Sequence, residues 1–186
     1  MTVKRFFSSG KNVLWLAGTL VLLGVLCYLL FGNLGVTFIN DYDEARHGAN
    51  AYEMIRNNDY LVSTYQGEPD YWNLKPPLSF WLIALAYRIF GYNAFALRFF
   101  SAVSTLIAAG AVALWSWRRA GHWAAPLALG VFVSGSLIFS LHFARYGDAD
   151  AQYQLFFTLA TLSALSCDRD IRWIYASGLF FGLAFL

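Results

Sequence analysis

Side chains that could carry chemistry are concentrated in two polar segments of an otherwise apolar sequence. Residues 33–75 hold most of the carboxylates, and residues 145–150 hold one arginine and two aspartates. A carboxylate can orient and deprotonate a hydroxyl group, and a fixed cation can stabilise negative charge on a leaving group. Aspartate, with a reference pKa of about 3.9, is a weak base in water, but a partly dry cavity would raise that pKa.

Each of these side chains also has a structural interpretation. Asp43 can cap the helix that follows it, and Lys75 can anchor the chain among lipid headgroups. Arg145 can form an ion pair with Asp148 or Asp150 at the end of a membrane span. No single residue therefore identifies a function.

The composition is typical of a membrane protein. Of the 186 residues, 59% are hydrophobic and 13% are charged, whereas a soluble domain carries roughly 25% charged residues. A net charge of +2 provides no broad basic surface, so nucleic acid is not an expected partner.

Cys27 and Cys167 lie in or beside apolar runs, without zinc or disulfide spacing. His47 and His142 fit packing or interfacial positions better than metal coordination.

Apolar runs close to the length that crosses a bilayer, about 20 residues, alternate with the polar segments. We predict an all-α integral membrane protein, a polytopic helical bundle. Its expected parts are a cytoplasmic N-terminus at 1–12, spans at 13–31, 95–117, 122–143 and 151–166, and a truncated fifth span at 173–186. The first run is long for the apolar part of a signal peptide, so we interpret it as a retained anchor.

The basic residues beside these runs predict the side of each loop. Lysine and arginine near span ends favour the cytoplasmic side, and they cluster near the N-terminus, at 118–119 and at 169–172. All three clusters lie inside only if the apolar run 76–90 rests on the membrane surface. Residues 32–94 and 144–150 are then loops on the same outer side.

The large outer loop is predicted to carry two juxtamembrane helices, near residues 44–58 and 76–90. In the first, Ala45, Ala49 and Tyr52 recur at helical spacing and form an apolar stripe. The second begins at paired prolines, which are tolerated in a first helical turn.

Short motifs follow one another in a specific order: Asp43-Glu44-Ala45-Arg46, Asp59-Tyr60-Leu61-Val62, Gly67-Glu68-Pro69, Lys75-Pro76-Pro77-Leu78, Phe90-Gly91 and Ala96-Leu97-Arg98. This order resembles the GT-C membrane glycosyltransferases, in the group of aminoarabinose transferases and protein O-mannosyltransferases. Segments 144–150 and 182–186 resemble later parts of the same group. In that family several more spans, and often a C-terminal soluble domain, would follow.

The resemblance implies roles for four carboxylates. The loop acid of the family matches Asp43, as catalytic base or acceptor-orienting carboxylate, with Glu44 beside it. The acid before the fourth span matches Asp150, and Asp148 is the alternative at that motif. We expect Asp43 and Asp150 to share a water-accessible pocket with the lysine that precedes the prolines.

That lysine, Lys75, is implied to bind the phosphate of the donor, with Arg46 and Arg145 as supporting cations. Many relatives carry a glutamate, implicated in metal binding, immediately before it. This sequence has Leu74 there, so a divalent cation at the site is an open question. The tyrosine that often follows the arginine of the loop motif is His47 here.

The implied activity is transfer of a sugar from a polyprenyl-phosphate donor to a lipid, glycan or protein acceptor, as in lipid A or protein glycosylation. The reaction would occur on the extracytoplasmic side of the bacterial inner membrane, with membrane lipid around the chain. One alternative is a non-catalytic membrane fragment or scaffold of the same fold. The other, a transporter module, is disfavoured because the spans carry almost no ionisable groups.

Overall fold

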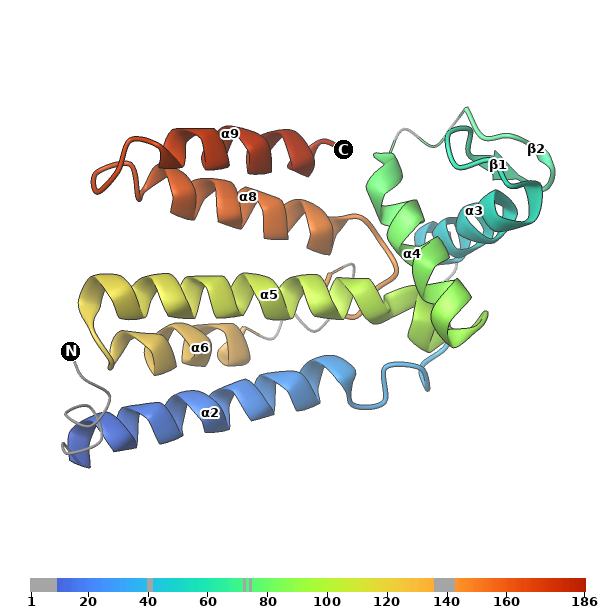
Figure 1. Ribbon diagram of the computed structural model, residues 1–186. Coiled ribbons are helices and arrows are strands. Elements are labelled where there is room, and N and C mark those ends of the chain that lie inside the picture. The colour runs from blue at the N-terminus through green and yellow to red at the C-terminus, as the bar shows by residue number, and fades with distance from the viewer. Residues whose placement is uncertain (1–9, 40–41, 72, 74, 136–142) are drawn as a thin grey trace.

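The computed structural model describes residues 10–39, 42–71, 73, 75–135 and 143–186, and it is mostly helical, as the sequence predicts (Figure 1). In chain order the elements are α2 (Gly10–Phe31), α3 (Asp43–Asn57), β1 (Thr64–Tyr65), β2 (Glu68–Pro69), α4 (Pro77–Phe90), α5 (Ala94–Ala120), α6 (Ala124–Ser134), α8 (Asp150–Ala164) and α9 (Trp173–Ala184).

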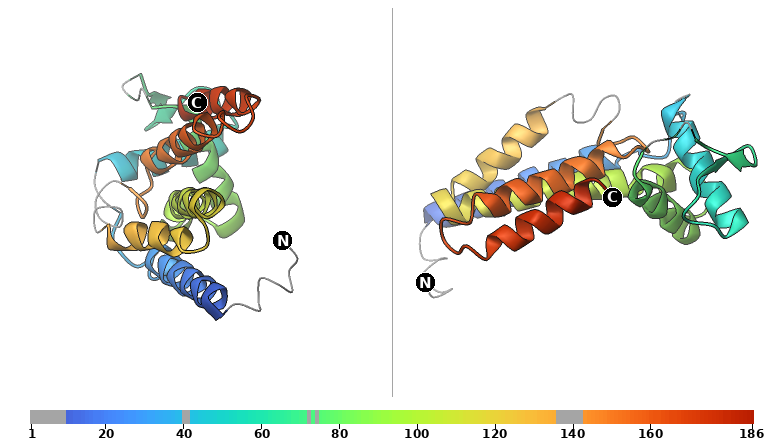
Figure 2. Two further views of the ribbon diagram at one scale, coloured as in Figure 1. Left: turned by 90° about the vertical axis from the view of Figure 1, so that its left-hand side faces the viewer. Right: turned by 90° about the horizontal axis from the view of Figure 1, so that it is seen from above.

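Helices α2, α5, α6, α8 and α9 run alongside one another as an elongated bundle (Figures 1 and 2). Helices α3 and α4 and the β1–β2 hairpin form a separate group at the end of the bundle where α2 finishes and α5 and α8 begin. The strands pair antiparallel, with Thr64 opposite Pro69. The sequence motifs between residues 43 and 91 therefore gather at one end of the molecule.

Two helices in the described part of the chain are long and apolar enough to cross a membrane. They cover Asn12–Phe31 and Ala94–Ala120, with mean hydropathies of 2.4 and 1.8. Helix α2 presents large apolar side chains outward, among them Leu14, Val21 and Tyr28, and a contiguous apolar surface of this kind needs an apolar environment. Helices α4, α6 and α9 are apolar but shorter. Residues 136–142 of the segment predicted as the third span lie outside the described residues.

Two apolar clusters hold the parts together. The first packs α2 against α5 and α6 through Leu26, Leu30, Ala109 and Leu129, among others. The second packs α3 and α4 against the start of α5 and includes Ala51, Ile83, Tyr87 and Leu97. Alanines at many of these positions let the helix backbones approach closely. The second cluster holds α3 and α4 on the bundle.

The turn between α4 and α5 sets the direction of α4. Gly91, with φ of 78°, adopts a backbone conformation that glycine accommodates without strain. The Asn93 side chain then caps α5 by accepting a hydrogen bond from the amide of Ala96 at 2.8 Å. Helix α4 consequently lies across the end of the bundle instead of continuing along it (Figure 1).

Candidate functional site

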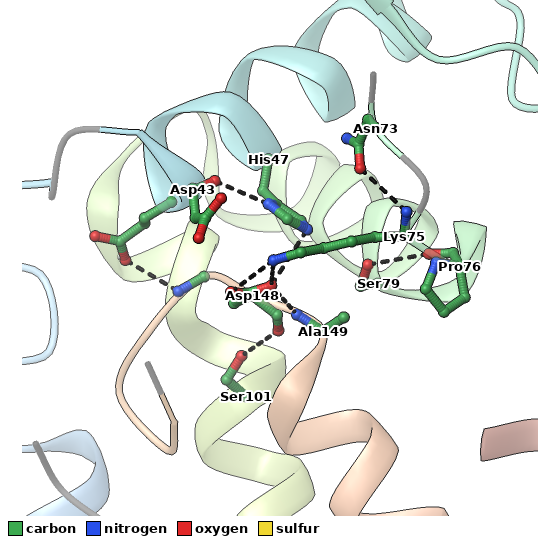
Figure 3. A network of polar contacts seen from close by, with 11 residues as sticks. Asp43, His47, Asn73, Lys75, Pro76, Ser79, Ser101, Asp148 and Ala149 are labelled. Atoms are coloured by element: carbon green, nitrogen blue, oxygen red, sulfur yellow. Dashed lines mark hydrogen bonds and ion pairs between the residues drawn. The ribbon is translucent and has the colours of Figure 1, made fainter. Parts of the chain in front are cut away.

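Lys75 and Asp148 meet where α3 and α4 join the bundle. The Nζ of Lys75, which precedes α4, donates to both carboxylate oxygens of Asp148 at 2.7 and 2.9 Å. Asp148 lies in the loop before α8. The lysine side chain is 34% exposed, whereas that of Asp148 is 3% exposed. The cation can therefore be reached from solvent while its partner is shielded. Figure 3 shows the pair.

The loop that carries Asp148 is held from two sides. The amide of Gly147 donates to Glu44 Oε1 at 3.0 Å, and the hydroxyl of Ser101 on α5 donates to the carbonyl of Asp148 at 3.5 Å. A Cβ at position 147 would lie 2.5 Å from Cγ of Leu97, so only glycine allows this approach to α5. The loop is thus wedged between α3 and α5.

His47 brings an imidazole to the same carboxylate. Its Nδ1 lies 2.8 Å from the carbonyl oxygen of Asp43, and since a carbonyl can only accept, Nδ1 carries the proton. The ring is 2% exposed and stacks on Phe80, with the ring centroids 4.7 Å apart. Its Nε2 lies 3.4 Å from Asp148 Oδ1 and has no hydrogen-bond partner among the described residues.

Asp43 is the first residue of α3 and is half-buried. Its carboxylate points toward the loop and the Lys75–Asp148 pair (Figure 3). The structural interpretation of Asp43 as a helix cap does not match the structure, because Tyr42 occupies the cap position and makes no side-chain cap hydrogen bond.

Glu44 lies beneath this cluster and is fully buried. Arg98 on α5 donates to its two oxygens at 2.6 and 2.8 Å. Arg98 also donates to the carbonyl oxygens of Leu34 and Phe38. One ion pair therefore connects α5, α3, the segment after α2 and, through Gly147, the Asp148 loop. Sequence reasoning gave Arg98 no role, and a lone arginine near a helix start offers no signal for one.

The other sequence candidates lie around this cluster in different settings. The guanidinium of Arg46 pairs with Asp70 and lies 5.1 Å from the Tyr65 ring centroid. The guanidinium of Arg145 donates to the carbonyls of Leu29 and Gly32 at 2.6 and 2.8 Å, where it meets the negative end of the α2 dipole. Asp150 is exposed in the first turn of α8. The structure thus gathers Asp43, His47, Lys75 and Asp148.

The charge states follow from these contacts. Burial alone raises the pKa of Asp148, but the Lys75 hydrogen bond, nearby His47 and the Ala149 amide outweigh burial and hold that pKa below its ordinary 3.8. Burial lowers the pKa of His47 below its ordinary 6.5, despite the attraction of Asp148 and Asp43 for a proton. At neutral pH, Asp148 is therefore an anion and His47 is neutral.

This cluster can bind an anion and accept a proton. Within the described part of the chain, no group of three or more His, Cys, Asp or Glu residues is placed to hold a metal ion, and Leu74 lies outside that part. The exposed face of Lys75 suits a phosphate, and the Asp43 carboxylate suits a hydroxyl donor. An arrangement of this kind fits transfer between a phosphorylated and a hydroxylated molecule.

Comparison with known proteins gives consistent matches. The family described as dolichyl-phosphate-mannose-protein mannosyltransferase matches residues 74–186. An undecaprenyl phosphate-alpha-4-amino-4-deoxy-L-arabinose arabinosyl transferase of Pseudomonas savastanoi pv. phaseolicola is 33% identical over 144 residues, which cover 75% of this chain and 25% of that one. A similar transferase of Shewanella sediminis is 32% identical over 150 residues. The chain thus spans about a quarter of the length of these relatives.

The fold also matches a solved structure. The crystal structure of ArnT from Cupriavidus metallidurans in the apo state aligns with a TM-score of 0.71 at 24% identity, over 95% of this chain and 32% of that chain. The same enzyme bound to undecaprenyl phosphate aligns with a TM-score of 0.67 at 21% identity, over 94% and 32% of the two chains. The arrangement of helices is therefore shared along nearly the whole of this chain.

Proposed function

Because the chain belongs to the dolichyl-phosphate-mannose-protein mannosyltransferase family, we propose that it contributes to sugar transfer from a polyprenyl-phosphate donor to a lipid, glycan or protein acceptor. The resemblance to GT-C glycosyltransferases of the aminoarabinose transferase group is confirmed. The activity is proposed for the complete protein, since the chain spans only a quarter of its relatives. The observation that carries the proposal is the ion pair between Lys75 and Asp148, which are far apart in the sequence, beside Asp43 and His47 of α3.

Lys75 is the proposed phosphate ligand. It is the cation that the cluster leaves partly open to solvent, and an ammonium group is a good partner for a phosphate oxygen. The ArnT structure with undecaprenyl phosphate supports a lipid phosphate of this type as the donor's leaving group. The supporting cations predicted from the sequence, Arg46 and Arg145, contact Asp70 and the end of α2 instead. We therefore propose that Arg46 and Arg145 hold the shape of the site.

Asp43 is the proposed base. Its carboxylate takes the proton of the acceptor hydroxyl as the acceptor oxygen attacks the anomeric carbon of the sugar. The bond from that carbon to the phosphate oxygen breaks, and its electron pair stays on the phosphate, where Lys75 offsets the negative charge. Of the two acids at the second motif, Asp148 contacts Lys75 directly, so we favour it over Asp150 as the partner of the lysine.

The proposed topology places this reaction on the extracytoplasmic face of the bacterial inner membrane. Arg118 and Arg119 end α5, and Arg169 and Arg172 lie between α8 and α9, at the end of the bundle away from the site. Basic residues favour the cytoplasmic side, so the opposite end, with α3 and α4, faces outward. In this arrangement the outer loop 32–94 rests on the membrane, and α4 lies along its surface.

The proposal is tested in membranes that carry the complete protein, with a panel of polyprenyl-phosphate sugars as donors. Asp43→Asn keeps the shape of the side chain and removes its basicity, so transfer should be abolished while membrane insertion survives. Asp59→Asn is the matched control, because Asp59 is exposed and accepts hydrogen bonds from the nearby amides of Leu61 and Val62. Normal turnover by the Asp43 variant would exclude its role as base.

A further inference from the structure

The Nε2 atom of His47 is a buried polar atom without a hydrogen-bond partner among the described residues. Nδ1 holds the proton of the neutral ring, because it faces the Asp43 carbonyl at 2.8 Å. The lone pair of Nε2 therefore faces the Asp148 carboxylate at 3.4 Å, and two acceptors face each other. Buried polar groups are rarely left unpaired, and one added proton on Nε2 would turn this contact into a charged hydrogen bond.

We propose that His47 takes up a proton from solvent when the donor phosphate binds Lys75, and so couples occupation of the phosphate site to pH. This inference rests on the proposed function of Lys75. The only bond formed in the step is N–H on Nε2, which then donates to Asp148 as Lys75 turns toward the phosphate. His47 acts here as a positioning residue, since it holds Asp148 and does not touch the reacting atoms.

The charges around His47 give the direction of the effect. Those facing the ring are Asp43 on its own helix, Lys75 before α4 and Asp148 before α8, while α4 itself contributes the uncharged ring of Phe80. Without donor, Lys75 balances Asp148 and opposes a proton on His47. A bound phosphate diester adds one negative charge, so the cluster then has two carboxylates and one phosphate around a single cation. His47 is the group placed to supply a second cation.

The same proton would assist the leaving group. A sugar-linked polyprenyl phosphate is a phosphodiester with one negative charge, and the phosphate released on transfer is a monoester whose second pKa is about 6. The product phosphate thus carries more negative charge than the donor. A protonated His47 keeps Asp148 paired while Lys75 is engaged with that phosphate. Release of the phosphate would return the His47 proton to solvent.

The test measures proton uptake on binding directly. Farnesyl methyl phosphate is titrated into the complete protein in detergent by calorimetry, because this diester keeps a single charge between about pH 5 and pH 8. Repeating the titration in buffers with different ionisation enthalpies counts the protons taken up. For the wild type, affinity should rise as pH falls, by a factor approaching about ten per pH unit where one proton is linked. Proton uptake should accompany that rise.

Two variants distinguish the effect of the proton on His47 from the effect of the shape of its ring. His47→Tyr keeps an aromatic ring against Phe80 and cannot gain a proton in this range, and His47→Gln keeps a polar side chain without the titration. Both should bind the probe with an affinity that does not change with pH. His122→Gln is the matched control, because His122 accepts from Trp117 at 2.6 Å in the turn after α5, so its pH response should equal that of the wild type.

The outcomes distinguish the inference from the function on which it rests. Binding without proton uptake in the wild type, or equal uptake in the Tyr and Gln variants, would overturn the role of His47 and leave the phosphate site intact. Absence of binding by the wild type at every pH would overturn the phosphate site itself, and the inference with it. If both variants failed to fold, the imidazole nitrogen resonances of His47 in labelled wild-type protein would decide: a shift to the charged form on binding of the probe supports the inference, and an unchanged neutral ring overturns it.

Discussion

Buried Asp148 depends on Lys75 for its charge partner, because the lysine side chain reaches solvent and the aspartate side chain does not. The lysine is partly exposed, while Asp148 is 3% exposed and retains its charge through the hydrogen bonds that it accepts. A buried carboxylate that loses its cation is expensive, whereas removing both charges together is often nearly neutral. The pair thus has a structural as well as a proposed chemical role.

This asymmetry predicts a non-additive mutant cycle. Lys75→Met should destabilise the protein by roughly 1–3 kcal/mol, because the buried Asp148 loses its lysine cation. Asp148→Asn in the same chain should recover much of that loss while sugar transfer stays abolished. Thermal unfolding in detergent of the two single variants and the double variant measures the coupling. Equal and additive losses would mean that the ion pair contributes no coupling energy.

The pKa shifts of Asp148 and His47 predict acid sensitivity in two stages. The folded protein holds the pKa of His47 below 6.5, so the stability from neutral His47 is present above about pH 6.5 and declines as pH falls toward the folded pKa. The folded pKa of Asp148 is below 3.8, so its stabilising contribution is lost only at lower pH. Unfolding temperatures across pH should decline in both ranges for the wild type.

His47→Tyr isolates the first stage of this decline. The variant should lose the decrease just below pH 6.5 and retain the decrease at lower pH, because Asp148 and Lys75 remain. His122→Gln serves as the reference for removing a histidine elsewhere. If the Tyr variant keeps the wild-type decline below pH 6.5, the acid sensitivity arises from another group.

At the scale of elements, the loop before α8 brings Asp148 to the site. It approaches α5 so closely that Gly147 has no room for a side chain, and its amide is held by Glu44. Glu44 is in turn held by Arg98. A buried network of this kind transmits a small displacement of the loop directly to Asp148, since close-packed interiors have little room to adjust.

Gly147→Ala should therefore reduce transfer more than it reduces insertion or expression. The added Cβ would meet Leu97 at 2.5 Å from Cγ and 3.2 Å from the carbonyl oxygen, and overpacking of this kind typically costs about 1–3 kcal/mol. Gly178→Ala on α9 is the matched control, because nothing lies within 4 Å of a Cβ there. Wild-type transfer by the Gly147 variant would show that the loop position tolerates displacement.

At the scale of the whole molecule, the charged groups discussed above lie at the two ends of the bundle. The proposed site lies at one end of the bundle, and the arginines that finish α5 and precede α9 lie at the other. Helix α2, with its apolar outer surface, runs between the two ends. A bilayer placed around the bundle would leave the two polar ends on opposite sides, which is the arrangement that the proposed chemistry requires.

Cysteine labelling tests this arrangement. In a background where Cys27 and Cys167 are replaced by serine, cysteines at the exposed positions Glu68 and Asp150 should react with an impermeant maleimide from the outer side. A cysteine at exposed Asp170 should react only after the membrane is opened. Labelling of positions 68 and 150 from opposite sides would exclude a shared site.

The sequence alone is informative about the fold class, the protein family and the approximate extent of the helices. Apolar length and charge clusters act locally along the chain. They predict helices at 13–31, 95–117 and near 44–58, and the structure has helices at Gly10–Phe31, Ala94–Ala120 and Asp43–Asn57. The order of short motifs is sufficient to recognise the family. Lys75 and Asp43 follow from those motifs, because their surroundings in sequence are distinctive.

Only the folded chain reveals which side chains meet. Asp148 and Asp150 are two residues apart, and the packing of Gly147 on α5 brings Asp148 to Lys75. Glu44 is adjacent to Asp43, but Arg98, far away in sequence, draws it into the interior. His47 belongs to the cluster because one helical turn places it below Asp43 and beside Phe80. Side-chain direction and pairing depend on contacts between distant segments, and no local pattern encodes those contacts.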